Sequence, residues 1–492
     1  MEPTVRRCSI ASFRLVAGAL VAAGALGGLG CGTSHNDGYG ATPGDASTGA
    51  TDTGMQTFGG PDGGSPDGPT FGNQGDAEPI GPVSTCANGG ATTVSGTVYD
   101  PAGKNPLYNI AVFVPSTTPS AFTSGASCET CAQLYTGNPV ASALTDATGK
   151  FTMTGVPAGA SVPLVIQIGK WRKQMTIPVT ACQDNPQPDK SLTLPSSHTA
   201  GDIPNIAIST GNSDTLECLL ARIGVEESEY TGGATGPGRL HIYQGGSLIS
   251  VIAGGAAPNT TPAGPASSAS LWDTDADIMQ YDLVLLSCEG IEAQSANQQV
   301  LFDYASAGGR VFASHFHYSW FNTGPFGVEN LATWTTGVNG IGNVNATMVT
   351  TLPNGQPFPK GVAMQQWLGN VGALTNGELP IQDGKHNSDV SASNTASQGW
   401  LVADSSSQAP GATQYFSFNT PVNAVNACGR VVYSDMHVGG ASGDMPSKGV
   451  PQECNIVDLS PQEKALEFML FDLSSCVTPN SQPPTPPPAT PQ

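Results

Sequence analysis

The chain has 492 residues, and only 11% of them are charged, against about a quarter in ordinary globular proteins. It carries 17 basic and 38 acidic residues, and the resulting net charge of −21 repels phosphate backbones and anionic lipid surfaces. We therefore expect no nucleic-acid partner and no electrostatic docking to membranes. The 62 glycines and 40 prolines indicate long linkers, but the chain is long enough for several folded domains.

Residues 1–31 have the composition of a secretory signal. Three arginines precede an apolar run at 15–29 that is too short to span a bilayer comfortably. The run ends at Leu29-Gly30-Cys31, which resembles a bacterial lipoprotein signal, in which the cysteine receives lipid and becomes the mature N-terminus. The resemblance implies lipidation of Cys31 and export to the cell membrane or outer membrane, with the lipid as the membrane contact. Simple secretion is the alternative.

Two segments have linker composition. Residues 32–85 contain 20 glycines and prolines, seven acidic residues and no lysine or arginine. They cannot bury enough apolar surface to offset the entropy of ordering, so a disordered tether is expected. Residues 477–492 contain seven prolines and are expected to form an extended tail. Two folded segments, 86–185 and 202–476, lie between them.

The first segment, 86–185, is predicted to form an all-β sandwich. Short β-rich runs alternate with turn signals, and strands are expected at 92–99, 109–114, 141–145, 151–154 and 162–168. The stretches 94–100, 110–112, 145–151 and 155–159 resemble the carboxypeptidase regulatory-like family, which has a prealbumin-like sandwich. The resemblance implies a non-catalytic module.

The second segment, 202–476, alternates strands and helices. Strands are expected at 203–209, 240–243, 282–288, 310–316 and 430–437, and helices at 216–223, 268–279, 296–307 and after Ser460, which with Glu463 forms a capping box. This alternation predicts an α/β doubly wound, flavodoxin-like domain. A β-rich insertion is expected at about 321–426.

The stretches 281–285, 304–311 and 429–433, with the histidines that follow the last two strands, resemble the class I glutamine-amidotransferase-like superfamily, nearest its ThuA-like branch. The resemblance implies a cysteine nucleophile at a strand-to-helix elbow. That place here reads Ala313-Ser314-His315-Phe316-His317. Without a thiolate no thioester can form, so glutamine hydrolysis is not expected.

Polar residues follow three of the expected strands. Ligands in open α/β sheets bind beyond the carboxyl ends of strands, and residues at i and i+2 of a strand share a face. Candidate metal ligands are therefore His315, His317, Asp435 and His437, a set suited to zinc or a similar divalent ion. Glu289, after Cys288, is a candidate ligand contact. No other cofactor is expected. The alternative is that these histidines are hydrogen-bonded structural residues.

A basic and aromatic run, Lys170, Trp171 and Arg172, falls in the first segment. It could bind an acidic polysaccharide through cation and stacking contacts. The alternative is an edge strand kept soluble by its charges.

The chain has 11 cysteines, and nine remain after Cys8 and Cys31, so at least one is unpaired or is paired between chains. We expect two disulfides within each segment, with Cys128 and Cys131 bonded to Cys86 and Cys182 and with Cys288 left over. The disulfide candidates are Cys86, Cys128, Cys131, Cys182, Cys218, Cys428, Cys454 and Cys476.

The sequence thus predicts an exported, lipid-anchored cell-envelope protein that acts as a binding or interaction module, with envelope components or polysaccharide as partners. The alternative is a metal-dependent hydrolase or sugar-modifying enzyme of ThuA-like type.

Overall fold

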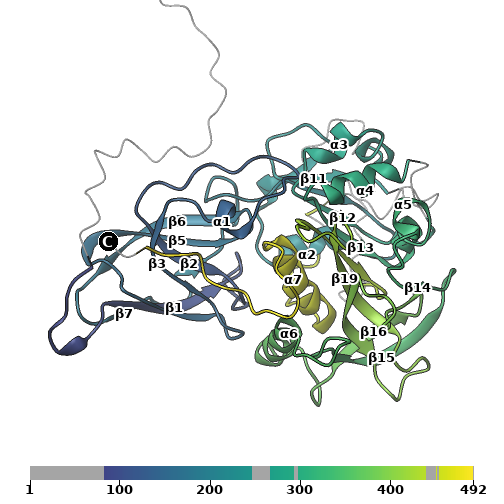
Figure 1. The fold of residues 1–492 in the computed structure, drawn as a ribbon. Helices are drawn as coiled ribbons and strands as arrows, with labels where there is room; N and C mark the ends of the chain where they lie inside the picture. The colour runs from purple at the N-terminus through teal and green to yellow at the C-terminus, as the bar shows by residue number, and fades with distance from the viewer. Residues whose placement is uncertain (1–82, 246–265, 293–296, 439–449, 452–453, 491–492) are drawn as a thin grey trace, which may run out of the picture. The chain divides into compact units, whose positions relative to one another are not determined.

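The computed structural model describes residues 83–245, 266–292, 297–438, 450–451 and 454–490. The predicted signal, Cys31 and nearly all of the predicted tether lie outside this part of the chain. All described residues belong to one compact unit, Ser65–Gln492. Its fold is mixed α/β and consists mostly of sheets (Figure 1). No helix within the described ranges is both long and apolar enough to cross a membrane.

Residues 93–193, all described, form two four-stranded sheets. One has the order β4-β1-β7 with β8 also paired to β1, and the other has the order β3-β2-β5-β6. The elements are η1 (Ala87–Gly89), β1 (Thr93–Tyr99), β2 (Ala111–Pro115), α1 (Cys131–Leu134), β3 (Pro139–Leu144), β4 (Lys150–Thr154), β5 (Gly159–Ile168), β6 (Trp171–Val179), β7 (Asp184–Pro186) and β8 (Leu192–Thr193). Val94 of β1 and Val112 of β2 are fully buried in one core, because alternate side chains of each strand face the other sheet.

The larger sheet has ten strands among the described residues, in the order β10-β11-β9-β12-β13-β20-β19-β18-β15-β16. The first six are parallel and the last four run antiparallel to their neighbours. Their bounds are β9 (Ile206–Ser209), β10 (Tyr230–Gly232), β11 (Leu240–Tyr243), β12 (Leu283–Leu286), β13 (Arg310–Ser314), β15 (Gly340–Met348), β16 (Leu379–Lys385), β18 (Ser397–Ala403), β19 (Thr413–Thr420) and β20 (Gly429–Ser434). The predicted insertion therefore extends the sheet, and only β14 (Thr333–Trp334) and β17 (Ser388–Asp389) pair apart from it.

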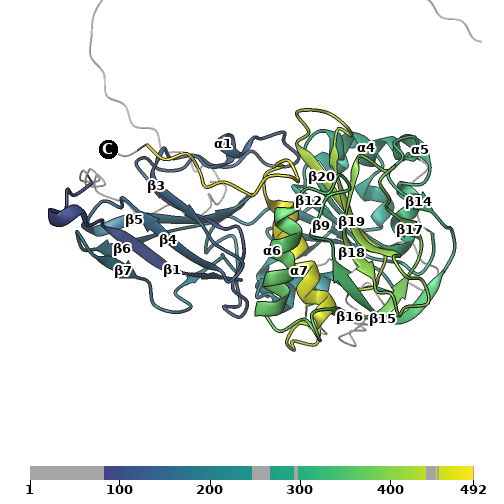
Figure 2. The ribbon, with the colours of Figure 1, turned by 60° about the horizontal axis from the view of Figure 1, so that its bottom comes forward.

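Helices lie on both faces of the parallel strands. They are α2 (Leu216–Arg222), η2 (Glu227–Glu229), η3 (Ser268–Leu271), α3 (Asp275–Met279), α4 (Gln299–Ser306), η4 (His315–Trp320), α5 (Gly324–Gly327), α6 (Pro359–Asn370) and α7 (Pro461–Ser474). Helices α2 and α7 share a core with Ile208 and Phe312, whereas α3 and α4 pack with Val284 and Val311 on the other face. Figure 2 shows α6 and α7 side by side against the sheet.

Two sequence expectations for this region need correction. The helix expected at 268–279 is broken into η3 and α3. The strand expected at 310–316 ends at Ser314, because His315 has a left-handed backbone and begins η4. The capping box of α7 is confirmed, since the Ser460 hydroxyl accepts from the Glu463 amide and the Glu463 carboxylate accepts from the Ser460 amide.

One buried carboxylate anchors α7 to its neighbours. Asp472 of α7 accepts hydrogen bonds from Lys360 Nζ of α6 and from Arg430 of β20, each at 2.6 Å. All three side chains are at most 2% exposed. This ion cluster fixes the helix layer to a central strand of the large sheet.

All eight disulfide candidates are paired, as Cys86–Cys182, Cys128–Cys428, Cys131–Cys476 and Cys218–Cys454. The expectation of two disulfides within each segment is wrong, because Cys128 and Cys131 bond to the second segment. Cys428 directly precedes β20 and Cys476 follows α7, so both lie where residues 125–131 contact the large sheet. Cys288 is the free cysteine of the described residues, as expected.

Candidate functional site

The carboxyl ends of three parallel strands bring together Cys288, His315 and His437. Cys288 follows β12, His315 follows β13, and His437 follows β20. The Cys288 Sγ lies 3.4 Å from His315 Nδ1, which lies 3.1 Å from His437 Nε2. One ligand atom from each residue lies within 4.8 Å of the other two. Cys288 and His315 are buried, and the His437 side chain is 11% exposed.

The position of the His315 ring follows from the backbone at the end of β13. His315 has φ = 41°, a left-handed conformation that costs an ordinary residue about 1–2 kcal/mol. The Tyr433 hydroxyl donates to the His315 carbonyl at 2.8 Å and so helps to hold this turn. The sharp turn directs the imidazole toward Cys288 and His437.

An aspartate orients the second histidine. His437 Nδ1 lies 2.9 Å from the carboxylate of Asp383, which is part of β16 and also has a positive φ. Since Nδ1 carries the proton of this hydrogen bond, Nε2 faces Cys288 and His315. Lys385 makes a second ion pair with Asp383.

The ionisation of these groups follows their surroundings. Burial alone would lower the pKa of His437, but the hydrogen bonds with Asp383 and Cys288 outweigh it and raise the pKa to about 10. The hydrogen bond from His437 lowers the pKa of Asp383 to about 2. Burial, reinforced by the charge of His437, lowers the pKa of His315 to about 3, so this ring is neutral at physiological pH.

The structure brings together only two of the four predicted ligands, His315 and His437. His317 lies in η4 rather than on a strand, and its Nε2 is 2.9 Å from the Ser287 carbonyl. Asp435 accepts hydrogen bonds from the backbone amides of Asn387 and Ser388. Both are buried, and neither lies on a strand, because β13 ends at Ser314 and β20 ends at Ser434.

Glu289 also lies at this edge of the sheet but does not join the cluster. It is 2% exposed, and its Oε1 accepts from the Ser209 hydroxyl at 3.3 Å. The structure thus gives Glu289 a contact with β9 rather than with the histidines.

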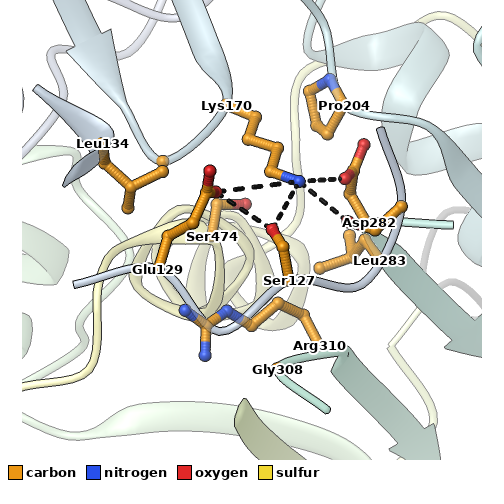
Figure 3. Close-up of a pocket in the computed structure, with 12 residues that line it drawn as sticks. Ser127, Glu129, Leu134, Lys170, Pro204, Asp282, Leu283, Gly308, Arg310 and Ser474 are labelled. Carbon is orange, nitrogen blue, oxygen red and sulfur yellow. Dashed lines mark hydrogen bonds and ion pairs between the residues drawn. The ribbon is translucent and has the colours of Figure 1, made fainter. Parts of the chain in front are cut away.

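The basic and aromatic run is not an exposed tip. Lys170 Nζ donates to Asp282 at 2.6 Å, to the carbonyls of Thr123 and Gly125, and to the Ser127 hydroxyl. Figure 3 shows this ammonium among Ser127, Glu129 and Asp282. The adjoining cavity measures about 40 Å³, which is room for a few water molecules.

The side chains of Trp171 and Arg172 also contact other parts of the protein. Trp171 is fully buried and its ring meets Phe471 of α7 edge to face at 5.9 Å. Arg172 Nε pairs with Asp202 at 2.8 Å, and its guanidinium lies over the Phe122 ring. The expectation that Trp171 stacks on a polysaccharide is therefore wrong, because this run forms the contact with the large sheet.

The cluster could hold a metal ion. A tetrahedral zinc ion with a Zn–S bond of about 2.3 Å and Zn–N bonds of about 2.0–2.1 Å separates sulfur from nitrogen by about 3.6 Å and two nitrogens by about 3.3 Å. The observed separations of 3.4 and 3.1 Å are within a few tenths of an ångström of these values. Thiolate and imidazole are both zinc ligands.

Two members of the site, Cys288 and Asp383, are not among the ligands predicted from the sequence. Cys288 was expected only as a leftover thiol, although its place at the end of an apolar strand beside two histidine-bearing strand ends was a usable signal. Asp383 lies in the predicted insertion, and nothing in its local sequence indicates that β16 reaches His437. The contact between Asp383 and His437 depends on the antiparallel strands that extend the sheet.

Comparisons with known proteins do not identify the chain. No family model and no curated protein matches it. Among solved structures, the mmIFT52 N-terminal domain is 11% identical with a TM-score of 0.26, over 41% of this chain and 81% of that one. A 9R-lipoxygenase from Cyanothece is 11% identical with a TM-score of 0.11, over 23% of this chain and 17% of that one. Such low TM-scores carry no argument about fold or function.

Proposed function

We propose that the protein is an exported, zinc-dependent hydrolase whose metal ligands are Cys288, His315 and His437. The observation that carries the proposal is that one sulfur and two nitrogens lie within 4.8 Å of one another, with the Cys288–His315 and His315–His437 separations close to the edges of a zinc tetrahedron. This favours the hydrolase alternative over the binding module that the sequence analysis placed first.

The number of ligands supports a catalytic rather than a structural ion. Structural zinc sites have four protein ligands, whereas catalytic sites have three and keep one position open. His437 is the cluster member with an exposed surface, since 11% of its side chain is exposed. A zinc ion there would supply a Lewis acid and a bound water with a pKa near 7. In hydrolysis the water oxygen bonds to the electrophilic atom of the substrate, and the leaving group departs with one of the water protons.

Asp383 has a supporting role in this proposal. Metal-bound histidines usually donate their second ring N–H to a carboxylate, which fixes the tautomer and the ring orientation. The 2.9 Å contact between His437 Nδ1 and Asp383 is such a pair. Zinc binding would displace the Nε2 proton of the charged His437, and the hydrogen bond to Asp383 would then leave the Nε2 lone pair directed at the metal.

We also propose export and lipid anchoring at Cys31, and the finer architecture expected from the sequence. Four disulfides among the described residues support an oxidising compartment. The strand order β11-β9-β12-β13, with helices on both faces, supports a flavodoxin-like domain at 202–476, and the two smaller sheets support a sandwich at 86–185. Metabolic labelling with radioactive palmitate, lost in Cys31→Ser, tests the anchor.

A second candidate function uses the same residues without a metal. Cys288 also hydrogen-bonds His437, and His437 pairs with Asp383, so the three have the order of nucleophile, base and orienting carboxylate. In that case Cys288 would attack the substrate itself. Activity would then persist in chelator and be abolished when iodoacetamide alkylates the thiol.

Zinc analysis of the exported, disulfide-bonded protein tests the proposal. Elemental analysis should find one zinc per wild-type chain, and Cys288→Ser and His437→Ala should lose it. His198→Ala is the matched control, because His198 also pairs with a carboxylate, that of Glu229 at 2.7 Å, but lies apart from the cluster. Hydrolysis of chromogenic esters should stop on chelation and return with zinc. A wild-type chain that binds no zinc would overturn the proposal.

A further inference from the structure

We propose that one loop, residues 210–215 between β9 and α2, positions all three zinc ligands, with Asp214 as its main positioning residue. The inference rests on the proposed zinc site. No sequence motif falls in this loop, and none of its residues belongs to the metal cluster.

The loop makes one hydrogen-bonded contact with each ligand-bearing strand end. The Ser213 amide donates to the Cys288 carbonyl at 3.0 Å. The Ser314 hydroxyl donates to Asp214 Oδ2 at 2.6 Å, directly before His315. The Val438 amide donates to both oxygens of Asp214 at 3.1 Å, directly after His437. A shift of the loop therefore moves the backbone at all three ligands.

These contacts cross the sheet. Strand β9, from which the loop leaves, is three positions from β20, which carries His437. At about 4.8 Å per strand, this is a span of about 14 Å. The three ligands follow three adjacent strands, β12, β13 and β20. The loop contacts the carboxyl end of each of these strands and so fixes the ligands relative to one another.

The loop packs closely against the strand ends that carry the ligands. A Cβ atom at Gly211 would lie 2.2 Å from the Cys288 carbonyl oxygen, so this position accepts only glycine without displacement. Asp214 is fully buried, and a buried carboxylate is costly unless hydrogen bonds satisfy it. The close approach at Gly211 and the burial of Asp214 are both expected if the loop packs against the strand ends that carry the zinc ligands.

Zinc affinity and the spectrum of the cobalt-substituted protein test the inference. Affinity is measured by competition with a chromogenic chelator, and the visible bands of cobalt report ligand geometry, which a merely structural role of Asp214 would not change. Asp214→Ala should lower zinc affinity by about 10- to 100-fold, the usual effect of removing a group that orients metal ligands, and should shift the cobalt bands. Asp214→Asn keeps one acceptor oxygen and should restore part of the affinity.

Two further variants separate positioning from stability. Ser314→Ala removes one hydrogen bond of Asp214 and should give a smaller loss of zinc affinity and a smaller shift of the cobalt bands. If Asp214→Ala does not fold, this variant tests the positioning role in its place. Asp100→Ala is the control, because Asp100 is also a buried carboxylate that accepts from two backbone amides, those of Lys104 and Asn105, but at the smaller sheets. It should leave affinity and spectrum unchanged.

The possible failures are distinguishable. If the wild-type chain binds zinc and the folded Asp214 and Ser314 variants bind it with the same affinity and cobalt spectrum, the loop inference is overturned and the zinc site stands. If the wild-type chain binds no zinc, the proposed function fails and the inference fails with it.

Discussion

Substitution of Asp472 by asparagine should destabilise the protein strongly. The change keeps the volume of the side chain but removes the negative charge that Lys360 and Arg430 share. Arg310 adds a third buried cation whose ionisation also depends on Asp472. The variant would thus hold uncompensated positive charge among side chains that water does not reach.

The expected loss is about 3–5 kcal/mol in the free energy of unfolding, the typical cost of removing one partner of a buried ion pair. It should depend on pH. Burial already lowers the pKa of Lys360 to about 8. Removal of Asp472 lowers this pKa further. The variant therefore already gains stability with rising pH below about pH 8, where the wild-type lysine is still charged, and the difference between the two proteins shrinks.

Urea denaturation under oxidising conditions, followed by tryptophan fluorescence, measures the loss. Asp458→Asn is the control, since Asp458 pairs with Lys104 at the surface, and this change should have little effect. The double variant Lys360→Met with Asp472→Asn should recover part of the stability because it removes one unpaired cation. A loss below about 1 kcal/mol for Asp472→Asn would refute the reasoning, because breaking a buried ion pair costs more than that.

Three further predictions concern stability. Glu217 is buried, and burial raises its pKa to about 8, so the folded state binds the proton more tightly than the unfolded state. Wild-type stability should therefore fall as the pH rises from about 4.5 to 8, and denaturation at both ends of this range should show the slope in the wild type but not in Glu217→Gln. Trp171→Ala should cost about 3–5 kcal/mol as a cavity in the core and leave binding to acidic polysaccharides unchanged; loss of glycan binding without loss of stability would contradict the buried position. Replacing both Cys131 and Cys476 by serine removes a disulfide that closes a separation of 345 residues and should cost about 2–5 kcal/mol in a thermal or urea melt, whereas an unchanged melt would argue against this pairing.

The strands and the long capped helix could be predicted because their signals are local. Val94 and Val98 alternate with half-buried residues on β1, and Ser460 and Glu463 mark the start of α7, so neighbours in the sequence decide these structures. The unpaired state of Cys288 also followed from an odd number of cysteines.

The disulfide pairing and most of the site depend on contacts between distant residues. Cys128 reaches Cys428 only because residues 125–131 lie against the large sheet, and no spacing rule indicates this. The i, i+2 rule failed for His315 and His317 because the strand ends one residue before them. Asp383 belongs to β16 in the antiparallel extension of the sheet, and Asp214 belongs to the loop between β9 and α2. No sequence pattern indicates that either residue lies at the site.

X-ray absorption at the zinc edge of the purified protein tests the central claim most directly. We expect one sulfur at about 2.3 Å and two imidazole nitrogens with one further light atom at about 2.0–2.1 Å. Cys288→Ser should lose the zinc and with it the absorption edge, whereas the control His198→Ala should keep the wild-type spectrum. A zinc-loaded wild-type protein whose first shell contains no sulfur would contradict the assignment of Cys288, His315 and His437 as the metal site.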